Sequence, residues 1–321
     1  MKKSSFVFAC LGAVLGLAAA TPAQAQANQH SFVSGNGTGT ACTFSNPCSS
    51  FNSAINATFA GGIITCVDQG ANAGDNAILG TATISKSITI DCAGTSAGTF
   101  STVIKGAGIV VVLRNLNISS IGLSGNSNGT GVDFQDGAAL FVEHCAVDGW
   151  NTGIGAGIHF APTSGTAKLH VTDSIFRHNG LAAGGAGIFI APTGGASTRI
   201  AIERTVVENN TYGIVVVGSG GTTLVEVKDS MIANNAINGI WAFSGGATTS
   251  IVVDHSASNY NGGSGVAASG NGGFVSLSDT TVAGNTTGLS TDTGGSIGSY
   301  GNNRINGNVS AGVTPTSVAL K

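Results

Sequence analysis

The segment VEVKDSMIANNAINGIW, residues 225–241, contains the pattern that decides the fold. Apolar residues alternate with polar ones from Val225 onward, which is typical of a β-strand with one buried face. The alternation stops at Ser230, Asn235 follows, and Gly239 then precedes the aliphatic Ile240. We therefore expect a strand, a turn and a second short strand within this segment.

The same pattern recurs from residue 110 to residue 313. Aligned units run over 111–118, 140–147, 169–176, 200–207, 225–232, 251–258 and 275–282, with a weaker one at 302–305, and their last positions are 23 to 31 residues apart. Asn recurs after the units at 179, 210, 235, 261, 285 and 308, and a Gly-aliphatic pair comes next. A repeat of this length indicates a solenoid. A 23-residue unit that already holds two or three strands has no room for a helix.

Stacked coils bury the apolar face that a single coil cannot bury. Equivalent strands pair about 4.8 Å apart, so like residues form ladders. The repeat resembles that of the right-handed parallel β-helix proteins of the secreted bacterial type, which share their fold with pectate lyases. The resemblance covers residues 60–313 and implies an all-β solenoid of about 9–10 coils. It does not specify an activity, because this fold hosts lyases, hydrolases, epimerases, adhesins and inert stalks.

The N-terminus predicts export. Lys2 and Lys3 precede an apolar run at 6–20, and Ala23 and Ala25 form a small-residue cleavage site, which together indicate a signal peptide. We expect a secreted or periplasmic protein with a signal peptide at 1–25, a Cys-containing cap segment at 26–60, the β-helix at 61–313 and a tail at 314–321.

Residues 47–56 predict a short helix that caps the open N-terminal end of the solenoid. Ser49 or Ser50 is its N-cap, and Phe51 and Ile55 share one face. The first strands are expected at 31–33, 63–67 and 84–90.

Five cysteines follow the predicted cleavage site. Cys42 and Cys48 flank Pro47 and are expected to bridge. Cys66 and Cys92 are one coil length apart, which places stacked Cα atoms about 5 Å from each other, within disulfide range. Cys145 occupies the Ser/Thr position of its unit and is expected to be a buried free thiol. No pair of cysteines has the spacing of a zinc site.

The composition argues against two classes of partner. Charged residues are 8% of the chain, against about 25% in typical domains, and the formal net charge is −3. This balance predicts no nucleic-acid partner and no membrane insertion.

Stacking also predicts which side chains point outward together. The residue after each Gly-aliphatic pair gives one outward column: Asp133, His159, Phe189, Val215, Trp241, Ala267, Ser290 and Thr314. Its neighbours two residues on include Gln135, Phe243 and Ser269, and the residues before the Gly include Tyr212, Asn238, Ser264 and Ala311.

Two groups in these columns are candidate sites. Asp133 and His159, with Asp136 nearby, could perform acid–base chemistry, with Tyr212 as a proton relay; the alternative is a surface cross-strand pair worth up to about 1 kcal/mol. Tyr212, Asn238, Trp241 and Phe243 could bind a sugar ring. The aromatic residues could instead pack beneath a loop or the C-terminal tail, or form a protein interface.

A third column reads His144, Asp173, Arg204, Asp229, His255 and Asp279, beside Glu203, Lys228 and Asp254. Alternating potential charges about 5 Å apart favour a ladder that stabilises coil stacking.

The recognisable catalytic patterns of related folds are missing. Residues 253–255 read Val-Asp-His, similar to the Ile-Asp-His of pectate lyases, but the acidic calcium site and the Arg pair of that family are absent, as are the motifs of polygalacturonases and alginate epimerases. The preferred hypothesis is a non-enzymatic protein that binds a polysaccharide or cell-surface glycan, or acts as a surface-interaction scaffold, with no cofactor or metal. The alternative is a polysaccharide lyase or epimerase, for which calcium would be a candidate cofactor.

Overall fold

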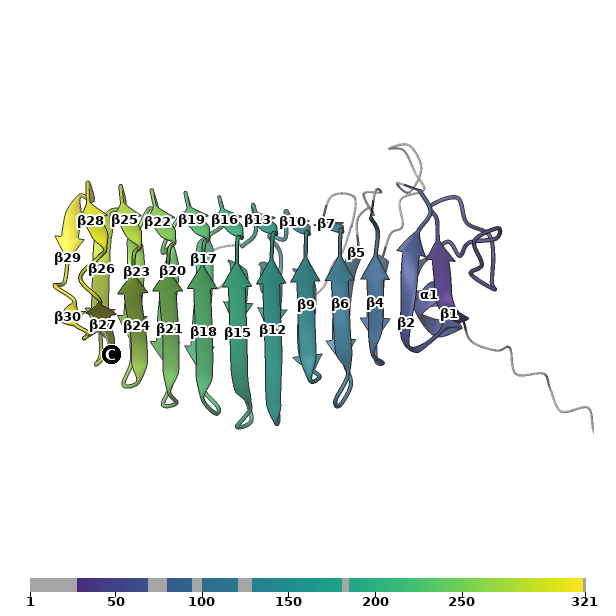
Figure 1. The fold of residues 1–321 in the computed structure, drawn as a ribbon, viewed down its shortest axis with the longest axis horizontal. Helices are drawn as coiled ribbons and strands as arrows, with labels where there is room; N and C mark the ends of the chain where they lie inside the picture. The colour runs from purple at the N-terminus through teal and green to yellow at the C-terminus, as the bar shows by residue number, and fades with distance from the viewer. Residues whose placement is uncertain (1–27, 69–79, 94–99, 121–128, 181–184, 320–321) are drawn as a thin grey trace, which may run out of the picture.

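The computed structural model describes residues 28–68, 80–93, 100–120, 129–180 and 185–319. The predicted signal peptide lies outside these ranges. Over the described residues the chain winds into coils that stack along one axis, as the row of equally directed strands in Figure 1 shows. The fold is the predicted right-handed parallel β-helix, with about 10 turns.

Each coil contributes strands to three parallel sheets, named here in the order in which a coil passes through them. The first sheet contains β1 (Asn28–Val33), β2 (Thr58–Cys66), β4 (Ile88–Asp91), β6 (Val110–Arg114), β9 (Ala139–Glu143), β12 (Thr166–Thr172), β15 (Ser197–Glu203), β18 (Thr223–Lys228), β21 (Thr249–Asp254), β24 (Gly273–Ser278), β27 (Ser296–Ser299) and β30 (Thr316–Ser317).

The second sheet is built from strands of three residues: β7 (Asn117–Ser119), β10 (Ala146–Asp148), β13 (Ile175–Arg177), β16 (Val206–Glu208), β19 (Met231–Ala233), β22 (Ala257–Asn259), β25 (Thr281–Ala283) and β28 (Arg304–Asn306). The third sheet contains β3 (Gly80–Ile84), β5 (Phe100–Lys105), β8 (Thr130–Asp136), β11 (Ala156–Phe160), β14 (Ala186–Ile190), β17 (Tyr212–Gly218), β20 (Ile240–Ser244), β23 (Ser264–Ser269), β26 (Thr287–Asp292) and β29 (Ser310–Gly312).

The register within the sheets is the one that the repeat predicts. Leu169 pairs with Leu140 on one side and with Ile200 on the other, and all three side chains are buried. The last positions of the eight units, 118, 147, 176, 207, 232, 258, 282 and 305, form consecutive pairs across the second sheet. The core is therefore a set of aliphatic columns, in which each fully buried side chain contributes about 1.5–3 kcal/mol.

The recurring Asn forms a buried ladder between the second and third sheets. Asn210 Oδ1 accepts hydrogen bonds from the backbone N–H of Asn179 at 2.9 Å and from its Nδ2 at 3.0 Å. Asn235 and Asn261 repeat this arrangement in the next coils. Because each amide satisfies backbone and side-chain groups of a neighbouring coil, this Asn ladder ties successive coils together.

We call the third predicted column, from His144 to Asp279, the charged column. It lies at the corner between the first and second sheets. All six of its residues have left-handed backbone conformations, from φ 52° at His144 to φ 42° at Asp279. This conformation is uncommon for non-Gly residues, and it bends the chain where the strand alternation stops. The following Ser or Thr is buried and bonds the neighbouring coil; Ser230 Oγ, for example, accepts from the Thr205 N–H at 3.1 Å.

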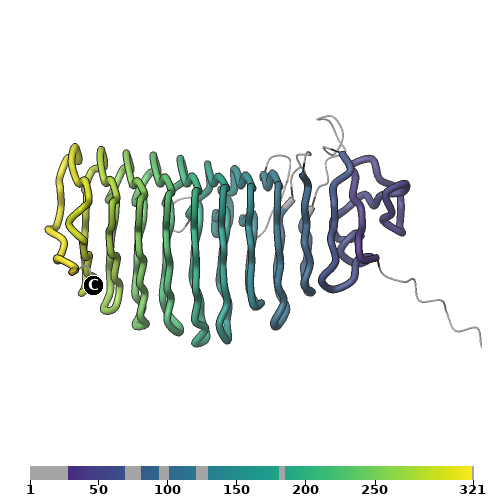
Figure 2. Tube along the Cα trace, in the orientation of Figure 1, coloured from purple at the N-terminus to yellow at the C-terminus, as the bar shows by residue number. Residues whose placement is uncertain are grey.

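The N-terminal end of the stack is closed by the predicted helix. Helix α1 (Phe51–Ala57) has Ser50 as its N-cap, whose Oγ accepts from the Ser53 N–H, and it buries Phe51 and Ile55 against β1, β2 and β3. Figure 2 shows this purple segment at the end opposite the yellow final coil. β1 pairs with β2, so the segment before the helix also contributes a strand to the first sheet.

The cysteines are arranged as the sequence predicts. Cys42–Cys48 and Cys66–Cys92 are disulfides with Cα separations of 4.6 and 4.7 Å. Cys145 is a buried free thiol, and burial raises its pKa to about 12.

Two predicted details are wrong. Residues 84–90 are not one strand, because β3 ends at Ile84 in the third sheet and β4 begins at Ile88 in the first sheet. In the last coil Leu289 pairs with Gly312 rather than with Val313, so Thr314 and Ala311 are each one residue out of register. The chain reaches Ser310 two residues after Asn308, and this short turn, not the Gly, sets the register there.

Candidate functional site

The predicted outward column runs along the third sheet. Cross-strand pairs connect Asp133 to His159, then Phe189, Val215, Trp241, Ala267 and Ser290. We call these seven residues the outer row. Stacking thus brings together side chains that are 23 to 30 residues apart in sequence.

Asp133 and His159 form a hydrogen bond at the N-terminal end of the outer row. His159 Nδ1 lies 2.8 Å from Asp133 Oδ1, and Gln135 Nε2 donates to the other carboxylate oxygen at 2.7 Å. The side chains are only 7% exposed at Asp133 and 16% at His159. Burial alone would raise the pKa of Asp133, but the bonds from His159 and Gln135 outweigh it and leave that pKa below its usual value. The carboxylate is therefore ionised and has both oxygens engaged.

Phe189 lies over the other side of the imidazole. Its ring stacks on that of His159 with centroids 5.5 Å apart. Because Phe189 covers one face of the imidazole, His159 would have to exchange a proton with a substrate at the edge of its ring.

Among the contacts of the described residues, none joins the other two catalytic candidates, Asp136 and Tyr212, to the Asp133–His159 pair. Asp136 Oδ1 accepts from the Gly137 N–H at 2.8 Å, and Asp136 pairs with Lys105 at the end of the strand. Tyr212 stacks instead on Trp241, further along the sheet.

The aromatic candidates form one cluster. The rings of Tyr212 and Trp241 stack with centroids 5.7 Å apart and an interplanar angle of 26°. Phe243 packs against Trp241 at 5.9 Å and 65°. All three side chains are half-buried. Trp241 Nε1 donates to Ser269 Oγ at 3.2 Å, which orients the indole across the neighbouring coil.

Polar groups lie beside this cluster on the next coils. Asn238 Oδ1 accepts from the Ser264 N–H at 2.8 Å, and Ser264 Oγ lies 2.8 Å from Ser290 Oγ. Ser269 and Ser290 were not among the predicted site residues. Their signal was their place in the outward columns, two coils or fewer from Trp241.

Part of the C-terminal tail is located away from the aromatic cluster. β30 pairs with β27 in the first sheet, so Thr316 and Ser317 do not cover Trp241. The sequence also predicts a loop at 180–187 that could fold over one of the faces, and its residues 181–184 lie outside the described residues.

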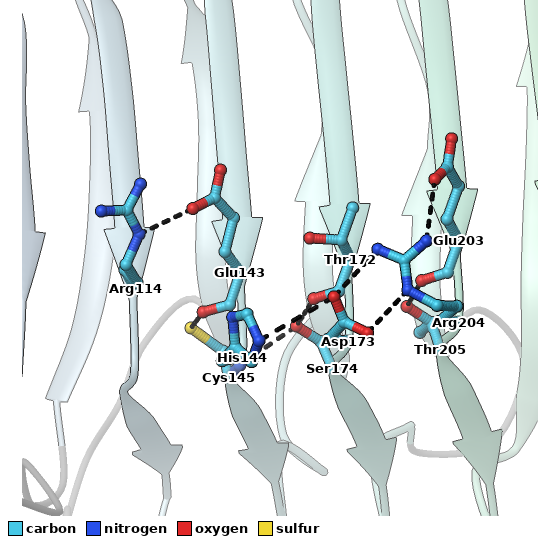
Figure 3. Close-up of polar contacts among 10 residues, drawn as sticks. All are labelled: Arg114, Glu143, His144, Cys145, Thr172, Asp173, Ser174, Glu203, Arg204 and Thr205. Atoms are coloured by element: carbon cyan, nitrogen blue, oxygen red, sulfur yellow. Dashed lines mark hydrogen bonds and ion pairs between the residues drawn. The ribbon is translucent and has the colours of Figure 1, made fainter. Parts of the chain in front are cut away.

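The charged column bonds mainly within itself. Arg204 donates to both carboxylate oxygens of Asp173, at 2.8 and 2.9 Å, and His144 Nε2 lies 3.9 Å from the same group (Figure 3). These bonds from Arg204 lower the pKa of Asp173. His255 lies 2.8 Å from Asp254 and 3.3 Å from Asp279, and the bond to Asp254 raises the pKa of His255.

A groove of about 650 Å³ runs along this column, and its lining includes Met231 together with Arg204, Asp229, His255, Asp279 and Arg304. The ion pairs along it, including Arg304 with Asp279 at 3.5 Å, join successive coils.

Two further features of the described residues concern a metal site and a helix that could span a membrane. Their His, Cys, Asp and Glu side chains do not gather in any group of three or more that could hold a metal ion. In the part of the chain that is described, no helix is long and apolar enough to cross a membrane.

Comparisons with known proteins agree with this architecture. The crystal structure of pectate lyase Pel9A is similar, with a TM-score of 0.52 and 15% sequence identity over 90% of this chain and 77% of that one. At this identity the likeness shows the fold alone. None of the curated protein sequences that were compared matches the chain. The family described as "Right handed beta helix region" matches residues 80–254. This match spans more than half of the sequence, and the chain therefore belongs to the right-handed β-helix family.

Proposed function

We propose that this chain is a secreted or periplasmic protein that binds a polysaccharide on the third sheet without transforming it. The observation that carries the proposal is the cluster of Tyr212, Trp241 and Phe243, three half-buried rings in contact on an outward face. Flat apolar rings with polar groups beside them suit the apolar face and the hydroxyl groups of a sugar ring. The two disulfides support an oxidising compartment.

Binding to a panel of soluble polysaccharides, measured by isothermal titration calorimetry, tests this proposal. Trp241→Ala should weaken binding at least tenfold, which corresponds to about 1.4 kcal/mol. Phe141→Ala is the matched control, because Phe141 is a half-buried aromatic residue on the first sheet. Equal losses in both variants, or an unchanged affinity in Trp241→Ala, would refute a site at the aromatic cluster.

A polysaccharide lyase or epimerase is the second candidate, and the Asp133–His159 hydrogen bond favours it. A lyase removes a proton from the carbon beside a uronate carboxylate, and a carboxylate-oriented imidazole is a suitable base. The pectate lyase fold of the similar structure raises the same possibility by analogy.

Turnover separates the two candidates. Incubating the chain with polyuronates, with and without calcium, should release no unsaturated product that absorbs ultraviolet light. Product formation that disappears in His159→Ala would establish the second candidate and displace the first.

A further inference from the structure

We infer that the polysaccharide bound on the third sheet is uncharged, and that polyuronates and other anionic glycans are disfavoured there. This inference rests on the proposed function and adds the class of ligand. It follows from where the chain places its formal charges around the aromatic cluster.

The coils that carry the aromatic cluster have almost no charge on this side. Their third-sheet strands and the turns on both sides occupy 209–222, 234–248, 260–272 and 284–295, all of them described residues. Within these four ranges the one Asp, Glu, Lys, Arg or His is Asp292, at the end of β26. The side chains around the rings are those of Ser, Thr, Asn, Ala and Val.

The Lys and Arg side chains of these coils, and of the coil that follows them, are on the other two sheets or at the corner between them. Arg199 and Lys228 belong to β15 and β18 of the first sheet, and Arg304 begins β28 of the second sheet. Arg204 lies at the corner between these sheets, where Asp173 accepts two of its hydrogen bonds. None of these four side chains belongs to the third sheet or its flanking turns.

On the third sheet itself, the Lys or Arg side chain among the described residues is that of Lys105 in β5, far from the cluster, and His159 in β11 is bonded to Asp133. Four strand spacings separate β5 from β17, which carries Tyr212, and five separate it from β20, which amounts to roughly 19–24 Å at about 4.8 Å per strand. This is more than twice the screening length of ~8 Å at physiological salt.

An anionic glycan would therefore lose more on binding than it gains. Each carboxylate brought against the rings gives up hydration, and a buried charge without a partner is costly. Asp292 adds repulsion at the C-terminal side of the cluster. A neutral glycan loses only hydroxyl hydration, and hydroxyl and amide groups of the kind found at Asn238, Ser264 and Ser290 can replace those hydrogen bonds.

A matched pair of polymers tests the ligand class. The probe is a polyuronate, compared with the same polymer after its carboxylates are converted to methyl esters, together with a neutral β-glucan. A neutral form should bind at least tenfold more tightly than the polyuronate, with an affinity that changes little between low and high salt. Tighter binding of the polyuronate, with an affinity that falls as salt rises, would overturn the inference.

Two variants separate failure of this inference from failure of the proposed function. Asp292→Lys should improve polyuronate binding severalfold, because it replaces the exposed like charge with an opposite one. Tight polyuronate binding that Trp241→Ala abolishes would contradict the ligand class but keep the site. Binding of any polymer that Trp241→Ala leaves unchanged, or no binding of any polymer, would refute the site and the ligand class together.

Discussion

The third sheet and the corner between the first and second sheets expose two rows of side chains on the same coils, and the rows are used differently. At the corner, Asp173 is bonded to Arg204, and His255 to Asp254 and Asp279, so the charges are paired largely with one another. On the third sheet, Tyr212 and Trp241 are half-buried rings in coils without a formal charge on that side. The same stacking of coils thus produces a charged column whose members pair largely with neighbouring charges, and an outer row whose aromatic rings leave apolar surface available to a ligand.

We expect the buried interior, rather than the outer row or the charged column, to hold the coils together. Asn235→Ala removes the Oδ1 acceptor of the Asn210 N–H and the donor to Val207 O, and it leaves buried groups unsatisfied. We expect a loss of about 3 kcal/mol in the free energy of unfolding, measured by urea unfolding.

The neighbouring residue provides the control for that variant. Asn234 is exposed and has φ 55°, and Gly occupies the equivalent position at 284 and 307. Asn234→Gly should change stability by a small fraction of that loss. If Asn235→Ala lowered the free energy of unfolding no more than Asn234→Gly does, the Asn ladder would not be what holds successive coils together.

The charged end of the outer row should behave as a structural pair. Asp133→Asn replaces an ionised acceptor of two hydrogen bonds, and we expect a loss of about 2 kcal/mol at neutral pH. Because the folded pKa of Asp133 is depressed, this stabilisation is present above the unfolded value of about 3.9 and disappears as the pH falls through the folded pKa.

Urea unfolding at neutral and acidic pH checks this dependence. The difference between the wild type and Asp133→Asn should shrink in acid, whereas the exposed Asp292→Asn should show little difference at either pH. A constant difference across the pH range would contradict the assignment of the loss to the ionised carboxylate.

The smallest effect is expected at the corner. Arg204→Met removes the bonds to Asp173, but both side chains are exposed, so solvent and salt screen the pair. The variant should lower the urea midpoint less than either change above, with a difference that narrows at high salt. It should also bind glycan like the wild type, and impaired binding would show that the two rows are not separate in function.

The sequence predicted the stacking closely because buried positions allow few residue types. The spacing of Asn210, Asn235 and Asn261 follows from a buried amide that must bond the next coil, so the register could be read from it. The order of Asp133, His159 and Phe189 in the outer row followed from that register. The last coil was misaligned because Gly312 was matched to Gly288, although the distance from Asn308 sets the register.

The contacts within the candidate site were beyond the sequence. Column assignment places Tyr212 and Trp241 on one face, but it does not give the ring stacking or the bond from Trp241 to Ser269, which depend on side-chain rotamers. It also does not show that Asp133 is nearly buried, because neighbouring outward side chains such as Gln135 and His159 cover it.

The most direct test of a glycan site at Trp241 uses the chain's own fluorescence. The sequence contains two tryptophans. Trp150 is 1% exposed and donates to Ile118 O, whereas Trp241 is half-buried on the outer row. Titration with a neutral glycan should change the emission of the wild type and leave that of Trp241→Phe, which retains Trp150, unchanged. A glycan that saturates the protein without altering the emission of the wild type, or that alters both proteins equally, would contradict a binding site at Trp241.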